Sequence, residues 1–231
     1  MKLSFVIPSF QDDRIIETIN SIHKLDFPKN CIEIIIQDGG SNKTLIDNIK
    51  KNLNSNDKLF IEKDRGIFDG INKGLKNSTG DLIATLGSDD RVFNLDYNEL
   101  KNTYYSGYNF IQYDIHYTND SWLPIRYWKA KKLTLFRYYL GMQYAHFGLI
   151  CTKEIYEKAG YFNTKNKINA DYEFFYTCCF LDKVIKQKVI NKVFVQMKIG
   201  GNSSAGFKAV YKGNIRILKF IFSKNPLLFF G

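Results

Sequence analysis

Short apolar runs alternate with segments of helical periodicity along the first ninety residues of the chain. Runs such as "KLSFVIP" and "CIEIIIQD" are rich in β-branched residues and typical of buried strands. Within 12–25 the isoleucines fall on one helical face, and Asp12 or Asp13 stands where an N-cap is expected. The pattern predicts strands over 2–8, 31–38, 58–63 and 81–87, and helices over 12–25, 43–53 and 66–78.

The alternation of strand and helix predicts an α/β fold with a wound, mostly parallel sheet. In such sheets, ligands bind beyond the carboxyl ends of the strands. This rule places three segments along one edge of the sheet: Pro8 to Phe10, Asp38 to Ser41, and Ser88 to Asp90. We therefore expect the adjacent carboxylates of Asp89 and Asp90 to face a ligand.

The second half of the chain has a less regular pattern. Around 104–145, an aromatic and basic run without a clear period follows one apparent strand. No internal repeat, low-complexity segment or linker divides the chain into independent domains. The remaining predicted elements are strands over 108–117 and 189–201, and helices over 153–163, closed by Gly160, and 171–184.

The net charge of +10 is concentrated in two stretches. Residues 122–140 and 208–231 each carry five Lys or Arg and no acid, so the rest of the chain is neutral overall. The tail has the pattern of a basic amphipathic helix, which suits an anionic membrane surface; packing of this helix on the domain is the alternative. The basic residues on its polar face are Lys208, Lys212, Arg216 and Lys219.

The sequence lacks the signatures of several other protein classes. Its four cysteines contain no C-x-x-C pair and indicate reduced core thiols in a cytosolic protein rather than a zinc site or a disulfide framework. The N-terminal apolar run is too short for a signal peptide. No run of about 18 apolar residues, which a spanning helix needs, is present.

Three acidic positions stand out by their place in the predicted fold. Asp38 ends the second strand, Asp89 and Asp90 follow the fourth, and Asp171 starts a helix whose dipole should keep it ionised. Each alone is explained as a turn residue or a helix cap. Together they suit a hard divalent cation bound with substrate phosphates, and a carboxylate that deprotonates a hydroxyl. The sequence has no P-loop, no dinucleotide fingerprint and no histidine spacing for zinc.

Four segments resemble the family 2 glycosyltransferases, whose members have the GT-A fold. They cover most of residues 3–180 in the family's order, and the part from Glu62 to Asp90 is the most specific. The resemblance implies a Rossmann-like wound, mostly parallel sheet with a C-terminal acceptor-side region, followed here by the basic amphipathic tail helix. The segments are "SFVIPSFQDDRIIETINSI", "IEIIIQDGGS", "EKDRGIFDGINKGLKNSTGDLIATLGSDD" and "HFGLICTKEIYEKAGYFNTKNKINADYEFF".

The resemblance also implies how a nucleotide-sugar is bound. Asp38 would hydrogen-bond the base, typically uracil, and Asp64 and Arg65 would lie near the base and ribose. Lys73 would lie near the sugar or the phosphates, and Asp89 would touch the ribose or the donor sugar. The full set implied for the donor is Pro8, Ser9, Phe10, Asp38, Asp64, Arg65, Lys73, Ser88 and Asp89.

The chemical roles follow from the same resemblance. Asp90 would hold Mn²⁺ or Mg²⁺ against the diphosphate, and Asp171 would be the catalytic base of an inverting displacement. The chain departs from the family at Ser88, the first position of the D-x-D motif, and at Ala170, where an acid usually precedes the base. His146 lies in a segment similar to the family's acceptor side, with a structural histidine as the alternative.

The expected function is transfer of a hexose or N-acetylhexosamine from a UDP-sugar to a lipid-linked or membrane-anchored saccharide in O-antigen, capsule or lipooligosaccharide synthesis. The expected location is cytoplasmic, peripheral on the inner face of the bacterial plasma membrane, where 126–137 and the tail would contact anionic lipid. Residues 1–100 would bind the donor, 101–200 the acceptor, and 201–231 the membrane.

Two alternative functions remain open at this stage. A metal-dependent nucleotidyltransferase acting on sugar phosphates would also bind a nucleotide through carboxylates, but it usually has a glycine-rich basic loop where this chain has "PSFQDD". A basic nucleic-acid-binding module would explain the charge. No aromatic RNA-binding motif, zinc finger or recognition helix supports it, so no nucleic-acid partner is expected.

Overall fold

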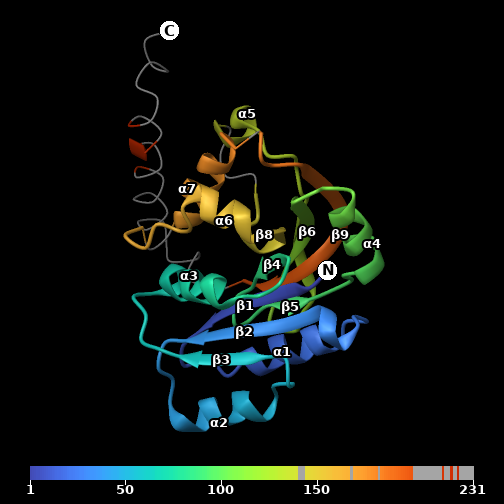
Figure 1. Cartoon of the computed structure of the whole chain (residues 1–231). Helices are drawn as coiled ribbons and strands as arrows, with labels where there is room; N and C mark the ends of the chain where they lie inside the picture. Colours follow the sequence, from blue (N-terminus) through green and yellow to red (C-terminus); the bar gives the residue numbers. More distant parts are fainter. Residues whose placement is uncertain are drawn as a thin grey trace.

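The strand–helix alternation predicted for the first ninety residues is present in the computed structural model (Figure 1). Every predicted element of this half is found, with ends that differ by a few residues. The structure describes residues 1–139, 144–166, 169–181 and 183–199, with Ile215, Lys219, Phe220 and Ser223. The elements are β1 (Leu3–Ser9), α1 (Ile15–His23), η1 (Lys29–Cys31), β2 (Ile32–Asp38), α2 (Lys43–Lys51), β3 (Lys58–Ile61), α3 (Ile67–Asn77) and β4 (Leu82–Thr85).

The second half contains the expected long elements and several short ones that the pattern did not indicate. The elements are β5 (Arg91–Val92), α4 (Tyr97–Tyr105), β6 (Phe110–Thr118), β7 (Pro124–Trp128), α5 (Leu135–Tyr139), η2 (His146–Gly148), β8 (Leu149–Thr152), α6 (Lys153–Ala159), α7 (Ala170–Cys178) and β9 (Gln187–Lys198). Strands such as β5 and β8 are too short to show a period of two in sequence. Gly160 ends α6 in the left-handed conformation (φ 86°), as its sequence position predicts.

One mixed sheet runs through the described residues in the order β3-β2-β1-β4-β8-β6-β9-β5, with β7 paired to β6. Strands β1 to β4 are mutually parallel, as expected for a wound α/β sheet. Strand β8 joins the two halves through antiparallel pairs with β4 and β6, and β6 pairs in parallel with β9. The sheet is thus parallel from β3 to β4 and mixed beyond β4.

Alternate residues of the central strands feed two hydrophobic cores on opposite faces of the sheet. Phe5 and Ile7 pack with the buried faces of α1 and α2 in one core. Val6, between them, packs with α3, α6 and α7 in the other. This period of two converts the apolar strands into a sheet that is covered by helices on both faces (Figure 1).

The N-terminus of α1 differs from the sequence expectation. Arg14 occupies the N-cap, and no side chain caps the helix, so neither Asp12 nor Asp13 has the predicted role. Asp12 instead accepts hydrogen bonds from Arg14 and from Ser88, far along the chain. A long-range contact therefore outcompetes the local cap.

The predicted tail helix falls almost wholly outside the described residues. Lys208, Lys212 and Arg216 are not among them, while Lys219 is helical and exposed. Among the described residues, no helix combines the length and apolar character that a membrane span requires.

Candidate active site

The carboxyl ends of the parallel strands meet at one edge of the sheet. Ser9 at the end of β1 is in register with Asp38 at the end of β2, and Val6 is in register with Thr85 at the end of β4. The Gly39 N–H donates to the Ser9 carbonyl (2.8 Å), which ties the two strand ends together. The segments after β1, β2 and β4 leave the sheet at this edge, as predicted.

Asp38 forms a tight turn after β2. Its buried carboxylate accepts hydrogen bonds from Gly40 N (2.9 Å), Ser41 N (2.6 Å) and Ser41 Oγ (2.7 Å). A carboxylate with several N–H and O–H donors is fixed in one orientation. The turn therefore holds Asp38 rigidly at the edge where a nucleotide base is expected.

Phe10 and Asp64 converge on the same turn. A Cβ atom placed on Gly39 would lie 2.8 Å from Asp64 Oδ2 and 3.3 Å from Phe10 Cδ2, so only glycine fits between them. The Phe10 ring is 63% exposed at this edge. Nearby, the buried Ser9 Oγ has no hydrogen-bond partner among the described residues. This edge thus presents an exposed aromatic ring, that of Phe10, close to a buried hydroxyl, that of Ser9, without a hydrogen-bond partner among the described residues.

The two basic residues expected to contact the donor, Arg65 and Lys73, form ion pairs with acidic residues close in sequence. Arg65 is largely exposed and bonds Asp69 within α3. Lys73 Nζ lies 2.6 Å from Glu62 Oε1 and donates to the Lys63 carbonyl (2.8 Å). Both side chains would have to exchange these partners in order to contact a donor.

The adjacent carboxylates of Asp89 and Asp90 fold back over Gly87. A Cβ atom on Gly87 would lie 3.0 Å from Asp90 Oδ2 and 3.1 Å from Asp89 Oδ1. The Gly87 N–H donates to Asp90 Oδ2 (2.7 Å), and Asp90 is only 2% exposed. Burial, and then the neighbouring Asp89 charge, raise the pKa of Asp90 to about 8.

A network of charged residues from the loop after β1 closes over this turn. Arg14 Nη1 lies 2.9 Å from Asp89 Oδ2, and Arg14 Nε lies 2.7 Å from Asp12 Oδ1. Ser88 Oγ donates to Asp12 Oδ2 (2.6 Å). Burial would raise the pKa of Asp12, but the hydrogen bonds from Arg14 and Ser88 outweigh it and leave that pKa below its ordinary value. Sequence reasoning missed Arg14, because nothing local links it to residues 88–90.

The acidic turn has the donor chemistry of a hard-cation site, although it is incomplete by itself. Carboxylate oxygens are the ligands that Mg²⁺ and Mn²⁺ favour, usually one or two with substrate phosphates and water. Asp90 is buried beside a second carboxylate, and added positive charge would favour its ionised form. Among the described residues, no cluster of three or more potential metal ligands exists. The residues therefore fit a cation that is completed by a diphosphate.

Asp171 is the second residue of α7, in its first turn. Burial raises the pKa of its carboxyl to about 6, although the Tyr172 N–H (2.9 Å) favours the charged form. Desolvation thus outweighs the helix N-terminus that was expected to dominate. The Tyr117 hydroxyl lies within electrostatic range of Asp90 and Asp171: burial raises the pKa of Tyr117, Arg126 lowers it, and both carboxylates raise it.

His146 lies beneath the edge rather than on it. Its Nε2 is 3.1 Å from Thr85 Oγ1, and its ring packs edge-on against Phe162 with centroids 4.7 Å apart. Burial lowers the pKa of His146 to about 3, so the ring is neutral at ordinary pH. These contacts favour the structural alternative for this histidine.

The basic run after β6 forms part of the wall beyond the acidic turn. Arg126 of β7 lies over the rings of Tyr117 and Trp128, with its Cζ 5.6 Å and 4.8 Å from their centroids. Arg91, next to Asp90, stacks on Trp122 at 3.7 Å. Cations and aromatic rings are therefore interleaved beside the edge, as the sequence suggested for this stretch.

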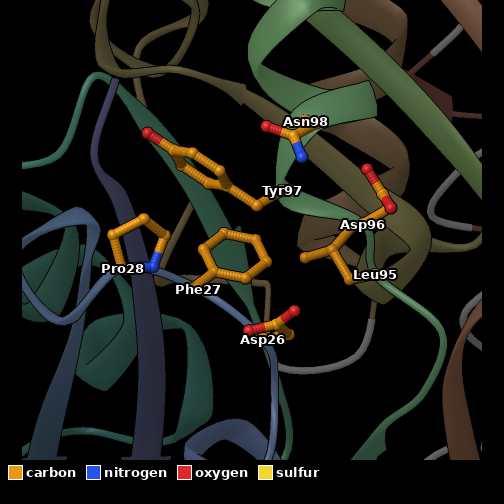
Figure 2. Close-up of a pocket in the computed structure, with 7 residues that line it drawn as sticks. All are labelled: Asp26, Phe27, Pro28, Leu95, Asp96, Tyr97 and Asn98. Atoms are coloured by element: carbon orange, nitrogen blue, oxygen red, sulfur yellow. The ribbon is translucent and has the colours of Figure 1, made fainter.

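A separate pocket of about 420 Å³ lies at the far end of α1 from Arg14 (Figure 2). It follows the C-terminus of α1 and borders the start of α4, with the Phe27 and Tyr97 rings packed edge to face at 5.1 Å. None of the sequence-predicted site residues lines it. Its lining residues are Asp26, Phe27, Pro28, Leu95, Asp96, Tyr97 and Asn98.

Comparison with curated proteins finds one relative with a transferase name. It is the dolichyl N-acetyl-alpha-D-glucosaminyl phosphate 3-beta-D-2,3-diacetamido-2,3-dideoxy-beta-D-glucuronosyltransferase of Methanococcus voltae, 31% identical over 91 residues. The match spans 37% of this chain and 28% of that protein.

Solved structures share the fold at low sequence identity. S. aureus TarS 1-349 in complex with UDP-GlcNAc has a TM-score of 0.68 at 19% identity, covering 96% of this chain and 67% of that chain. Mannosyltransferase PcManGT from Pyrobaculum calidifontis, in complex with GDP-Man and Mn²⁺, has a TM-score of 0.63 at 16% identity, covering 96% and 63%. Against the longer TarS chain, this chain spans 40% of the length. These likenesses show a GT-A type of α/β fold.

The sequence of the chain also matches a protein-family model over most of its length. The matched region runs from residue 4 to residue 183 and so contains the acidic turn, the Asp38 turn and the start of α7. With the GT-A type of fold, this match shows that the chain belongs to glycosyl transferase family 2.

Proposed function

We propose that the protein is a metal-dependent, inverting glycosyltransferase that uses a UDP-sugar. The observation that carries the proposal is the pair of adjacent carboxylates, Asp89 and Asp90, on the turn that follows β4 at the carboxyl edge of the sheet. Asp171, near the start of α7, is a separate carboxylate whose pKa is raised by burial. The buried pair suits a cation, and the separate carboxylate suits a base.

The donor would bind along the ends of β1, β2 and β3. Phe10 offers an exposed ring to a base, and the rigid Asp38 carboxylate offers an acceptor to a base N–H. Pro8, Ser9 and Asp64 would complete the nucleoside pocket. The complexes of TarS with UDP-GlcNAc and of PcManGT with GDP-Man support a nucleotide-sugar donor.

The reaction would proceed by direct displacement at the anomeric carbon. Asp171, with a pKa of about 6, is mostly ionised at neutral pH and would accept the proton of the attacking hydroxyl. Asp90 would hold the Mn²⁺ or Mg²⁺ whose charge stabilises the departing diphosphate. Asp89 would contact the ribose or the donor sugar. Attack opposite the leaving group gives a β-linked product from an α-linked donor.

The acceptor would be a lipid-linked saccharide in the synthesis of a surface polysaccharide. The name of the Methanococcus voltae relative includes a dolichyl phosphate-linked sugar, which supports this class. Residues 1–100 would bind the donor and 101–200 the acceptor. The basic stretch 126–137 and the tail 201–231 would hold the protein at the inner face of the membrane, since each basic residue contributes on the order of 1 kcal/mol near anionic lipid.

Two measurements test this function. Binding of UDP should strengthen in Mn²⁺ relative to EDTA, and a chain that ignores UDP would overturn the donor assignment. Asp171→Asn should lower transfer by about 10²–10⁴-fold, because the base is lost, while UDP affinity stays near the wild-type value. Glu173→Gln, an acid in the same helix turn, is the control. Near-normal turnover of the Asp171→Asn variant would refute the base assignment.

A further inference from the structure

One face of α1 lies against the acidic turn and presents polar side chains to it. Arg14, Thr18 and Ser21 stand at spacings of four and three, so they share a helical face. Ile15, Ile19 and Ile22 are fully buried in the core beneath the sheet. The helix therefore anchors to the sheet through its isoleucines and meets residues 88–92 with its polar stripe.

Thr18 is the centre of this contact. It is fully buried, and its Oγ1 lies 2.6 Å from the Asp90 carbonyl and 2.9 Å from the Ser88 carbonyl. A hydroxyl has one proton, so Thr18 shares it between the two carbonyls on either side of Asp89. A β-branched side chain in a helix has restricted rotamers, which keeps the hydroxyl aimed at the turn.

Ser21 provides a second attachment one turn further along α1. Its Oγ accepts a hydrogen bond from Val92 N (3.0 Å) and donates to the Thr18 carbonyl (2.7 Å). The main chain at residues 88, 90 and 92 is thus bonded to one rigid helix. Because Gly87 N–H also holds Asp90 Oδ2 (2.7 Å), the orientation of the Asp90 carboxylate follows from the path of this main chain.

We propose that Thr18 is a positioning residue for the cation site: its hydroxyl holds the Ser88 and Asp90 carbonyls so that the Asp90 carboxylate faces the diphosphate-bound metal. The inference rests on the proposed function and adds a residue to it. Groups that orient a metal ligand change metal affinity by about 10–100-fold when they are removed. Thr18 acts through the Asp90 turn, so its loss should weaken the metal-dependent part of UDP binding more than the metal-free part.

The test compares UDP binding by titration calorimetry in MnCl₂ and in EDTA. Thr18→Val keeps the shape of the side chain but leaves the two carbonyls without their donor, and should lower UDP affinity in Mn²⁺ by about 10–100-fold. Affinity in EDTA should fall much less, since the metal contributes nothing to binding there and only contacts of the turn itself, such as Asp89 to the ribose, can be affected. Thr18→Ser, which retains the hydroxyl, should restore Mn²⁺-dependent binding.

A matched control is Thr177→Val. Thr177 also lies in a helix and donates to a carbonyl (Glu173 O, 3.1 Å), but its hydroxyl is bonded within α7. The Thr177→Val variant should bind UDP with the same affinity as the wild type, both in MnCl₂ and in EDTA. If Thr18→Val does not fold, the pair Thr18→Ser and Thr18→Ala isolates the hydroxyl in the same way.

The outcomes separate this inference from the proposed function. Wild-type protein that binds no UDP in either buffer would overturn the donor assignment and leave nothing for Thr18 to position. A second outcome would overturn the role of Thr18 alone. In that outcome the wild type binds UDP in a Mn²⁺-dependent way and Thr18→Val binds it equally well. If Thr18→Val does not fold, equal binding by Thr18→Ala and Thr18→Ser has the same meaning. Equal losses in MnCl₂ and EDTA would also overturn it, because they would indicate a general change of fold.

Discussion

Replacing Asp90 by asparagine should stabilise the metal-free protein while removing its response to metal and UDP. Asp90 is 2% exposed and lies beside Asp89, so the folded chain resists its ionisation. The amide has nearly the shape of the protonated acid and can still accept the Gly87 N–H hydrogen bond. It remains neutral at every pH, and the variant therefore avoids the cost of a buried charge.

The magnitude follows from the pKa of the buried acid. Burial raises the pKa of Asp90 from 3.8 to about 8, so between these values the folded chain holds a proton that the unfolded chain has released. Stability then falls as the pH rises, by about 1.4 kcal/mol per pH unit, until the folded pKa is passed. From about pH 6 to about pH 9, the wild type should lose about 3 kcal/mol of unfolding free energy at this site.

The assay is urea unfolding of wild type and Asp90→Asn in EDTA across this pH range. The difference between the two free energies should grow by about 3 kcal/mol in favour of the variant. Asp171, with a pKa of about 6, is almost fully ionised above about pH 7, so it adds little further pH dependence there. Asp171 and the other titrating groups are present in both proteins, so their contributions cancel in the difference between the two unfolding free energies. Asp13→Asn, which removes an exposed acid from the loop between β1 and α1, should show no such divergence.

Adding Mn²⁺ and UDP should stabilise the wild type relative to the variant and so narrow the difference. A ligand at 100 times its dissociation constant stabilises the folded state by about 2.7 kcal/mol, and the wild type should gain this where the variant does not. Parallel pH curves for the two proteins in EDTA would refute the assignment of a strongly raised pKa to Asp90. If the unfolding free energy of the wild type rose with pH relative to that of the variant above about pH 6, the upward direction of the Asp90 pKa shift would be refuted.

Two further substitutions test the packing and charge of the first ninety residues. Gly74→Ala places a Cβ atom 2.5 Å from Val6 Cγ1, so α3 must move off the sheet; overpacking of this kind should cost about 1–3 kcal/mol in urea unfolding, and wild-type stability would contradict the contact. Glu33→Gln removes a buried carboxylate bonded by Lys2, Ser4 and Thr79. These hydrogen bonds outweigh burial and lower the pKa of Glu33 from 4.5 to about 2. The variant should lose about 3 kcal/mol at neutral pH, a difference that disappears as the pH falls from about 4.5 towards about 2; a constant difference would count against the pKa.

Much of the structure of the first ninety residues was predictable from local patterns. The strand and helix order, the end of β2 at Asp38 and the position of the acidic turn after β4 were all inferred correctly. The elements follow from hydrophobic periodicity, which is read over a few residues at a time. Their common edge follows from the order of the elements, because parallel strands end at the same edge of a sheet. The left-handed Gly160 after α6 belongs to the same class.

Other features depend on contacts between residues far apart in the chain. Asp12 or Asp13 was expected to cap α1, but neither does, and Asp12 instead bonds Ser88, 76 residues away. Arg14 was not singled out, because its partner Asp89 is brought to it only by the packing of α1 against the sheet edge. The short strands β5 and β8 exist because neighbouring strands supply their hydrogen bonds, not because their sequences require it.

The sequence alone therefore determined which residue types stand at the carboxyl edge of a wound sheet, because hydrophobic periodicity and family motifs are written in the order of the chain. Only the tertiary structure decided how those residues behave. Burial makes Asp90 and Asp171 weak acids, Arg14 closes over Asp89, and Thr18 holds the turn between them. The reason is physical: pKa values and orientations depend on desolvation and on partners in space, which the order of residues does not specify.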